Sequence, residues 1–269
     1  MIIKNLLLLI LIGFLSTSVH SEEKMGIVFM HGKQAEPNQN FYGGLHKKMG
    51  DAGMIVLKPE MPWSRNRFID GDWDKAMKEI GINVKSLQDS GVNNIVLVGH
   101  SIGSPAALSY ASRYPNQIKA VALLAPGHVP YHYSLCIPYS PIKFCAVKDG
   151  VEKAKNEIAS GNADKKQPLP DINQGRTNSV WMTPRDYLTY FDPLSDAEMA
   201  VTAAKISSAI PVLWVIGDAD YLIRAGREYA FEKLPKNPKS TYLEVSANHV
   251  TTPEKASDQI IEWLKKLHE

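Results

Sequence analysis

A Gly-x-Ser-x-Gly motif at residues 99–103 constrains this chain more than any other stretch. It follows an apolar run at residues 94–98, which predicts a short buried strand, and it precedes an Ala- and Ser-rich helix predicted over residues 102–114. A strand that turns at once into a helix forces the central residue into a left-handed conformation. The two glycines leave room for the turn, so Ser101 should stand exposed at the end of the sheet. The alternative is that five small residues simply form a tight turn.

Apolar runs alternate with amphipathic segments on both sides of this motif. The predicted strands lie at residues 25–30, 54–57, 94–98, 118–124, 211–216 and 240–245. The predicted helices lie at residues 42–51, 73–89, 102–114, 224–234 and from 252 to near the end. This alternation is typical of parallel βαβ units with helices on both faces, so we expect an α/β fold with a mostly parallel sheet of about six strands.

The alternation breaks between about residues 130 and 208. This segment has no clear strand, many aromatic residues and prolines, and one polar helix near residues 151–159. A long insertion at one end of a parallel sheet is usually a cap over a site. We therefore expect a cap at about residues 130–208.

The N-terminus predicts a secretory signal peptide over residues 1–21. Lys4 precedes an apolar run at residues 6–15, and a small polar stretch allows cleavage after Ser18 or Ser21. The run is short for a bilayer span, although an uncleaved anchor is the alternative. We expect a periplasmic or secreted protein with no stable membrane insertion after cleavage, whose folded domain is residues 22–269.

Composition and cysteine usage narrow the remaining classes. With 30 basic and 28 acidic residues, the 269-residue chain has a formal charge of only +2, which argues against a nucleic-acid partner. The sequence has no cluster with metal-ligand spacing, so we expect neither a metal nor a cofactor. In an oxidising compartment, Cys136 and Cys145 are expected to form a disulfide, the alternative being two free thiols.

Ser101 needs a base and a carboxylate to become a nucleophile. In parallel sheets, reactive groups follow the carboxyl ends of strands, so the search is limited to strand exits. His249 follows the last predicted strand and is our candidate base. The fallback bases are His128 and His132, where the predicted cap begins. The candidate acid is Asp220, after the strand at residues 211–216. Asp218 and Asp192 are its alternatives.

Two backbone amides should stabilise the oxyanion that forms on a substrate. The amide of Ile102 follows the nucleophile at the start of a helix, where negative charge is favoured. The second donor should come from the loop after the first strand, where Gly32 permits a close approach; Lys33 is our choice and Gln34 the next. The alternative is that His31-Gly32 is merely a strand end.

Taken together, the sequence resembles the α/β-hydrolase family in its serine-nucleophile, esterase- and lipase-like branch, over essentially residues 24–269. The resemblance rests on four stretches at strand exits: residues 29–32, 99–103, 215–220 and 248–249. It implies the family's mostly parallel sheet with an inserted cap. The chain departs from the family by starting at what would be the third strand, so the first two strands are expected to be absent. The cap matches no lid type, so no substrate is implied.

These features lead to one main hypothesis and two alternatives. The main hypothesis is an exported serine hydrolase that cleaves a partly apolar, small-molecule carboxylic ester through a Ser-His-Asp triad and an acyl-enzyme. One alternative is a thioesterase or peptidase that uses the same triad. The other is a noncatalytic ligand-binding protein that kept the fold.

Overall fold

The computed structural model describes residues 24–136 and 145–267. The predicted signal peptide, residues 1–21, lies outside the described residues, as do its two cleavage positions. In the described part of the chain, no helix combines the length and the apolar character that crossing a bilayer would require.

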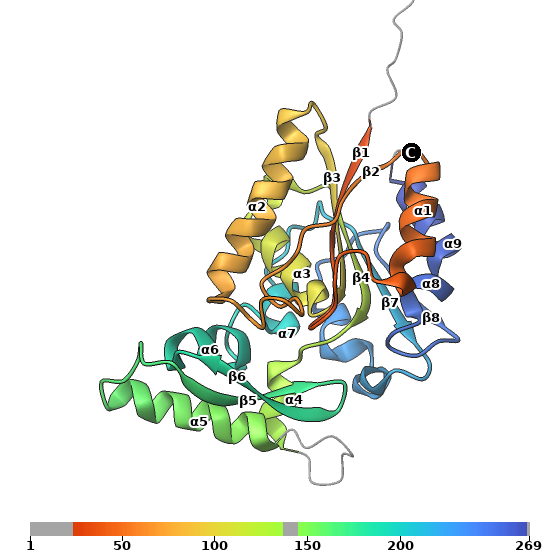
Figure 1. The fold of residues 1–269 in the computed structure, drawn as a ribbon. Coiled ribbons are helices and arrows are strands. Elements are labelled where there is room, and N and C mark those ends of the chain that lie inside the picture. The colour runs from red at the N-terminus through yellow and green to blue at the C-terminus, as the bar shows by residue number, and fades with distance from the viewer. Residues whose placement is uncertain (1–23, 137–144, 268–269) are drawn as a thin grey trace, which may run out of the picture.

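A six-stranded parallel sheet forms the centre of the molecule, in the strand order β2-β1-β3-β4-β7-β8 (Figure 1). The strands are β1 (Met25–Met30), β2 (Ile55–Leu57), β3 (Asn94–Ser101), β4 (Ala120–Pro126), β7 (Val212–Gly217) and β8 (Thr241–Val245). The four central strands are almost completely buried, because helices cover both faces and leave only apolar neighbours. The predicted fold class is confirmed.

Two apolar clusters, one on each face of the sheet, hold the helices in place. Alternate residues of β1 divide between them: Val28 packs on the side of α2 and α3, and Ile27 on the side of α1 and α9. These helices and the short α8 are α1 (Gly43–Asp51), α2 (Trp73–Asp89), α3 (Gly103–Arg113), α8 (Thr252–Lys255) and α9 (Ser257–Lys265). The Asp72 carboxylate accepts a hydrogen bond from the Lys75 amide and so caps the start of α2.

The segment between β4 and β7 lies at the carboxyl end of the sheet (Figure 1). It contains α4 (Pro130–Leu135), α5 (Cys145–Ala159), β5 (Gln167–Asn173), β6 (Arg176–Met182), α6 (Pro184–Phe191) and α7 (Met199–Ala203). The expectation of no clear strand here is wrong, because β5 and β6 form an antiparallel hairpin. Two prolines in β5 and the polar character of β6 hide the strand pattern, yet both are tolerated in a two-stranded sheet that consists only of edges.

Two predicted helices are interrupted. The helix expected at residues 224–234 is replaced by short 3₁₀ turns. The turn at Tyr221–Ala225 ends at Gly226, which has a φ of 69°, and the turns at Arg227–Tyr229 and Phe231–Lys233 are separated by Ala230. The C-terminal helix breaks at Ala256 into α8 and α9. Neither break affects the sheet.

Cys136 and Cys145 form a disulfide, as predicted, with their Cα atoms 4.4 Å apart. It joins the end of α4 to the start of α5. The disulfide therefore closes the chain on either side of residues 137–144, which lie outside the described residues.

Candidate active site

Ser101 occupies a sharp turn between β3 and α3. Its φ of 55° is left-handed, as the sequence predicts for the centre of a strand-to-helix turn. A Cβ atom on Gly99 would overlap the backbone of Gly103, so the first glycine is required by the turn itself. A Cβ atom on Gly103 would instead overlap the carbonyl group of Met30 in the neighbouring strand. The second glycine is therefore required by the packing of the turn against β1.

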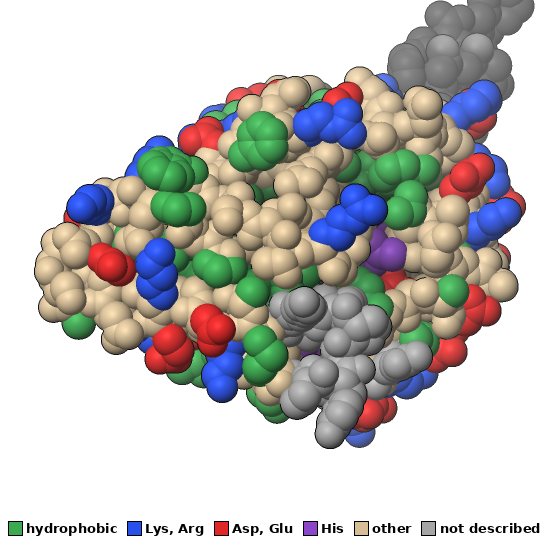
Figure 2. Space-filling model, turned by 60° about the horizontal axis from the view of Figure 1, so that its bottom comes forward, with side chains coloured by type: hydrophobic (Ala, Val, Ile, Leu, Met, Phe, Trp, Pro, Cys, Tyr) green, Lys and Arg blue, Asp and Glu red, His purple; other side chains and the backbone are tan. Residues whose placement is uncertain are grey.

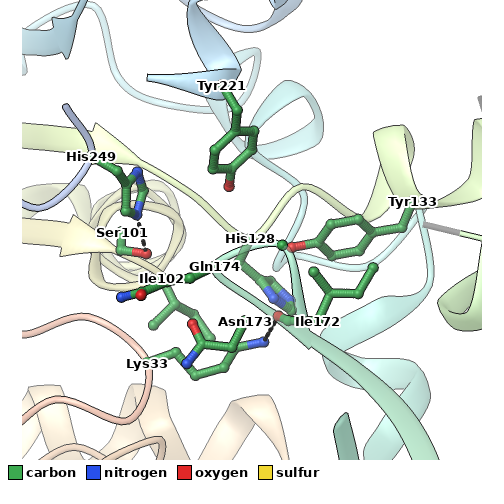
Figure 3. Close-up of a pocket in the computed structure, with 11 residues that line it drawn as sticks. Lys33, Ser101, Ile102, His128, Tyr133, Ile172, Asn173, Gln174, Tyr221 and His249 are labelled. Carbon is green, nitrogen blue, oxygen red and sulfur yellow. Dashed lines mark hydrogen bonds between the residues drawn. The ribbon is translucent and has the colours of Figure 1, made fainter. Parts of the chain in front are cut away.

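The side chains of Ser101, His249 and Asp220 form one hydrogen-bonded chain (Figure 3). His249 Nε2 lies 3.0 Å from Ser101 Oγ, and His249 Nδ1 lies 2.7 Å from Asp220 Oδ2. The carboxylate of Asp220 is buried and also accepts the Leu222 amide at 2.9 Å, which fixes its orientation. Because an ionised carboxylate only accepts, Nδ1 of His249 donates to it, and Nε2 is left to accept the Ser101 proton.

The alternative acids make other contacts. The Asp218 carboxylate accepts the Ala247 amide at 3.1 Å and so braces the loop after β8. The Asp192 carboxylate lies in the inserted segment, where it accepts the Leu194 amide and pairs with Lys155. Neither carboxylate contacts His249.

The fallback bases are also engaged elsewhere. His128 Nε2 lies 2.6 Å from the Tyr190 carbonyl oxygen. The His132 ring packs edge-on against Tyr229, with ring centroids 4.7 Å apart. Neither imidazole is hydrogen-bonded to Ser101.

The two amides proposed as oxyanion donors belong to residues that line one cavity. Lys33 and Ile102 line the same cavity as Ser101, and within the described residues neither amide donates a hydrogen bond. The alternative donor, the Gln34 amide, is already bonded to the Trp63 carbonyl oxygen at 2.8 Å. Gly32 lets the backbone of the loop after β1 come close to Ser101, because a Cβ atom on residue 32 would lie only 3.2 Å from Ser101 Cβ.

His100 has a connecting role that the sequence analysis did not foresee. Its Nε2–H donates to the His249 carbonyl oxygen at 2.9 Å, and its Nδ1 accepts the hydroxyl proton of Tyr42 at 2.7 Å. The same hydroxyl accepts the Gly32 amide at 2.9 Å. Burial and the neighbouring His249 lower the pKa of His100 to about 3, so it stays neutral. His100 thus ties the loop of His249 to the loop of Lys33. The only feature of the sequence that could have indicated this role is that His100 is a polar residue at the end of a buried strand.

The cavity beside Ser101 is small, and its lining is about equally polar and apolar. Its volume is about 30 Å³, enough for a water-sized group. Its walls come from the core and from the inserted segment, and the lining residues include Lys33, His128, Tyr133, Gln174 and Tyr221 (Figure 3). From the side of the inserted segment, histidine surface shows only in small gaps between other side chains (Figure 2).

The Lys33 side chain fastens the inserted hairpin to the core. Its buried ammonium pairs with Asp171 at 2.5 Å and donates to the Ile172 carbonyl oxygen at 3.0 Å, both in β5. Gln34, the residue after Lys33, adds a second link to β5, because Asn173 Nδ2 donates a hydrogen bond to Gln34 Oε1 at 3.0 Å. The loop that carries Lys33 is therefore held by the hairpin, whose residues 172–175 also line the cavity.

Comparison with known proteins agrees with this architecture. Residues 58–144 match the family model of the alpha/beta hydrolase fold. A 2-hydroxy-6-oxo-6-phenylhexa-2,4-dienoate hydrolase from Comamonas testosteroni is 22% identical over 205 residues, which cover 71% of each chain.

Two solved structures illustrate the shared fold. Est1E from Butyrivibrio proteoclasticus, solved with ferulic acid bound, superposes with a TM-score of 0.65 at 17% identity and covers 92% of this chain and 91% of its own. A monoacylglycerol lipase from Paleococcus ferrophilus gives a TM-score of 0.63 at 21% identity, over 91% and 95% of the two chains. With the parallel sheet and the match over residues 58–144, these likenesses show that the chain has the alpha/beta hydrolase fold, and they support a hydrolase enzyme.

Proposed function

We propose that this protein is an exported serine hydrolase that cleaves a small, partly apolar carboxylic ester. The observation that carries the proposal is the continuous hydrogen-bonded chain from Ser101 Oγ through His249 to Asp220. A serine hydroxyl is a weak nucleophile unless a base takes its proton, and this arrangement supplies that base with its tautomer fixed.

In the proposed reaction, His249 Nε2 takes the Ser101 proton while Oγ attacks the acyl carbonyl carbon. The Lys33 and Ile102 amides stabilise the resulting oxyanion, a contribution of about 3 kcal/mol for each donor of this kind. His249 then gives the proton to the departing alcohol, and an acyl-enzyme remains on Ser101. Water, activated by the same imidazole, releases the acid. Asp220 stabilises the imidazolium formed in each step.

The test combines labelling with two matched carboxylate variants. A fluorophosphonate probe should modify wild-type protein at Ser101 and leave Ser101→Ala unmodified. With p-nitrophenyl esters of increasing chain length, Ser101→Ala should lose activity, and Asp220→Asn should lower kcat by about 10⁴-fold because His249 adopts the wrong tautomer. Asp218→Asn is the matched control and should keep kcat within about tenfold.

Other results would redirect or end the proposal. A protein that is folded but neither labelled nor active on any ester would be a binding protein. Turnover of thioesters or amides but not of esters would reassign the substrate. Full activity in Ser101→Ala would exclude the mechanism.

The export part of the proposal is tested separately. Expression of the full chain in a bacterial host should place the mature protein in the periplasm or the medium. Its N-terminal sequence should begin at Val19 or Glu22, according to whether cleavage follows Ser18 or Ser21. An intact Met1 in the cytosolic fraction would contradict export.

A further inference from the structure

His128 stands in the wall of the cavity with half of its hydrogen-bonding capacity unused. Its side chain is buried, with a relative exposure of 3%, and its Nε2 lies 2.6 Å from the Tyr190 carbonyl oxygen. Because a carbonyl oxygen only accepts, the proton is on Nε2 and Nδ1 keeps its lone pair. Within the described residues, Nδ1 has no hydrogen-bond partner. His128 Nδ1 is therefore a buried hydrogen-bond acceptor without a donor, in a residue that lines the cavity.

The backbone places this imidazole close to the reacting serine. The amide of the preceding residue, Gly127, donates to the Ser101 carbonyl oxygen at 3.2 Å, and His128 lines the same cavity as Ser101. His128 has a φ of 62°, a left-handed conformation that costs a non-glycine residue about 1 kcal/mol or more. The ring packs edge-on against Phe191, with centroids 5.0 Å apart. Such strain, held by packing, is concentrated at functional positions in proteins.

The surroundings favour a neutral donor over a charged one. An ammonium group in this buried place would need an anion to balance its charge. The charge of the nearby Asp171 carboxylate is already balanced by Lys33 at Oδ1, and its Oδ2 has no hydrogen-bond partner within the described residues. A hydroxyl group needs only one acceptor and brings no charge. The cavity of about 30 Å³ also suits a group of that size.

The position of His128 indicates which part of an ester it would meet. In Figure 3, Ser101 lies beside His249, and the His128 ring lies away from that pair, toward Lys33 and Ile172. A departing alcohol must receive its proton from His249, so it lies on the His249 side. The acyl group is then the part that extends toward His128.

We infer that His128 Nδ1 accepts a hydrogen bond from a hydroxyl group on the acyl part of the substrate, so the enzyme prefers esters of short hydroxy acids. This inference rests on the proposed ester hydrolysis and adds the substrate class. A site with a buried acceptor discriminates against an analogue that lacks the hydroxyl, because the acceptor is then left unpaired.

The experiment compares matched ester pairs that differ by one hydroxyl: ethyl lactate with ethyl propionate, and ethyl 3-hydroxybutyrate with ethyl butyrate. For one pair, the wild-type kcat/KM should be at least tenfold higher for the hydroxylated ester. In His128→Phe this ratio should fall to about one. The matched control is His132→Phe, since His132 also has a buried unpartnered nitrogen but does not line the cavity. That variant should keep the wild-type ratio.

The inference is overturned if wild-type protein shows no preference in either pair, or prefers the deoxy ester, which would mean that water alone fills the site. It is also overturned if folded His128→Phe keeps the preference. The wild-type ratio needs no variant, so misfolding of His128→Phe would not protect the idea. If the deoxy and hydroxylated esters are both cleaved equally well, the proposed hydrolase function stands and only the substrate class fails.

Discussion

Left-handed backbone conformations gather around the reacting serine. Besides Ser101 and His128, Gln34 and Ala125 have φ values of 55° and 41°. These residues lie in the three loops or strand ends that surround the cavity, and each conformation is costly for a residue with a Cβ atom. Because the packed sheet holds all of them, the geometry at Ser101 is set before a substrate arrives.

Gly127, the residue before His128, should also be intolerant of any side chain. A Cβ atom there would lie 2.9 Å from Ser101 Oγ and 3.2 Å from His249 Cε1, both of which are needed in place. We expect Gly127→Ala to fold but to lower kcat on a p-nitrophenyl ester by at least 100-fold, because a displaced nucleophile loses its alignment with the base. Steady-state kinetics and circular dichroism measure the two effects.

Gly50→Ala is the control for this prediction. Gly50 lies in α1, and a Cβ atom there meets nothing within 4 Å, so the variant should keep full activity and gain up to about 1 kcal/mol in stability. Wild-type activity in Gly127→Ala would show that the serine can move aside without loss.

The sequence foretells the contacts that depend on local pattern and misses those that depend on distant partners. Ser101 is the last residue of β3, and Asp220 and His249 follow β7 and β8, so their meeting could be anticipated from the parallel topology. The bonds of His100 join it to residues 58 and 149 positions away. The Lys33 pair with Asp171 spans 138 positions. No periodicity or motif in the sequence predicts contacts between residues so far apart along the chain, so these contacts are seen only in the folded structure.

Among the elements, the β5–β6 hairpin was not anticipated from the sequence, although it lines the cavity and is bound to Lys33 and Gln34. Parallel strands can be recognised in a sequence because both of their faces are buried and their residues are therefore uniformly apolar. The hairpin has one partly exposed face, two prolines and a turn at Gln174 and Gly175, both with positive φ values. The turn fixes the register of the hairpin, and Lys33 fastens β5 to the core.

The Lys33–Asp171 pair should be important for the hairpin because both side chains are almost fully buried. Lys33→Met alone or Asp171→Leu alone leaves one uncompensated buried charge, so each should lower the free energy of unfolding by about 3–5 kcal/mol. The double variant removes both charges and should recover most of that loss. Urea denaturation of the three variants measures the coupling.

An exposed pair provides the comparison. Lys85 and Asp89 are 71% and 63% exposed, so Lys85→Met should change the free energy of unfolding by less than about 0.5 kcal/mol. If both buried single variants behaved like Lys85→Met, or if the double variant lost the sum of the two, the hairpin would not depend on this pair.

For the molecule as a whole, the buried histidines set the response to acid. Burial lowers the pKa of His31, His100 and His128, and lowers that of the partly buried His46 to about 4. The unfolded chain takes up protons at these positions near pH 6.5, whereas the native chain does not until a lower pH. Stability is therefore fully present above about pH 6.5 and falls as the pH decreases.

The contribution of one histidine to this acid response can be measured at His100, because its pKa falls to about 3 in the native protein. Between pH 6.5 and 4.5, the free energy of unfolding of the wild type should decrease by about 2 kcal/mol more than that of His100→Gln, since the variant lacks the group that the unfolded chain protonates. Urea denaturation at half-unit pH steps measures the difference. Between pH 7.5 and 8.5 the two curves should run parallel, because the imidazole is neutral in both states there. Parallel curves down to pH 4.5 would mean that His100 is protonated in the folded protein, and its bond to the Tyr42 hydroxyl would then have to be reversed.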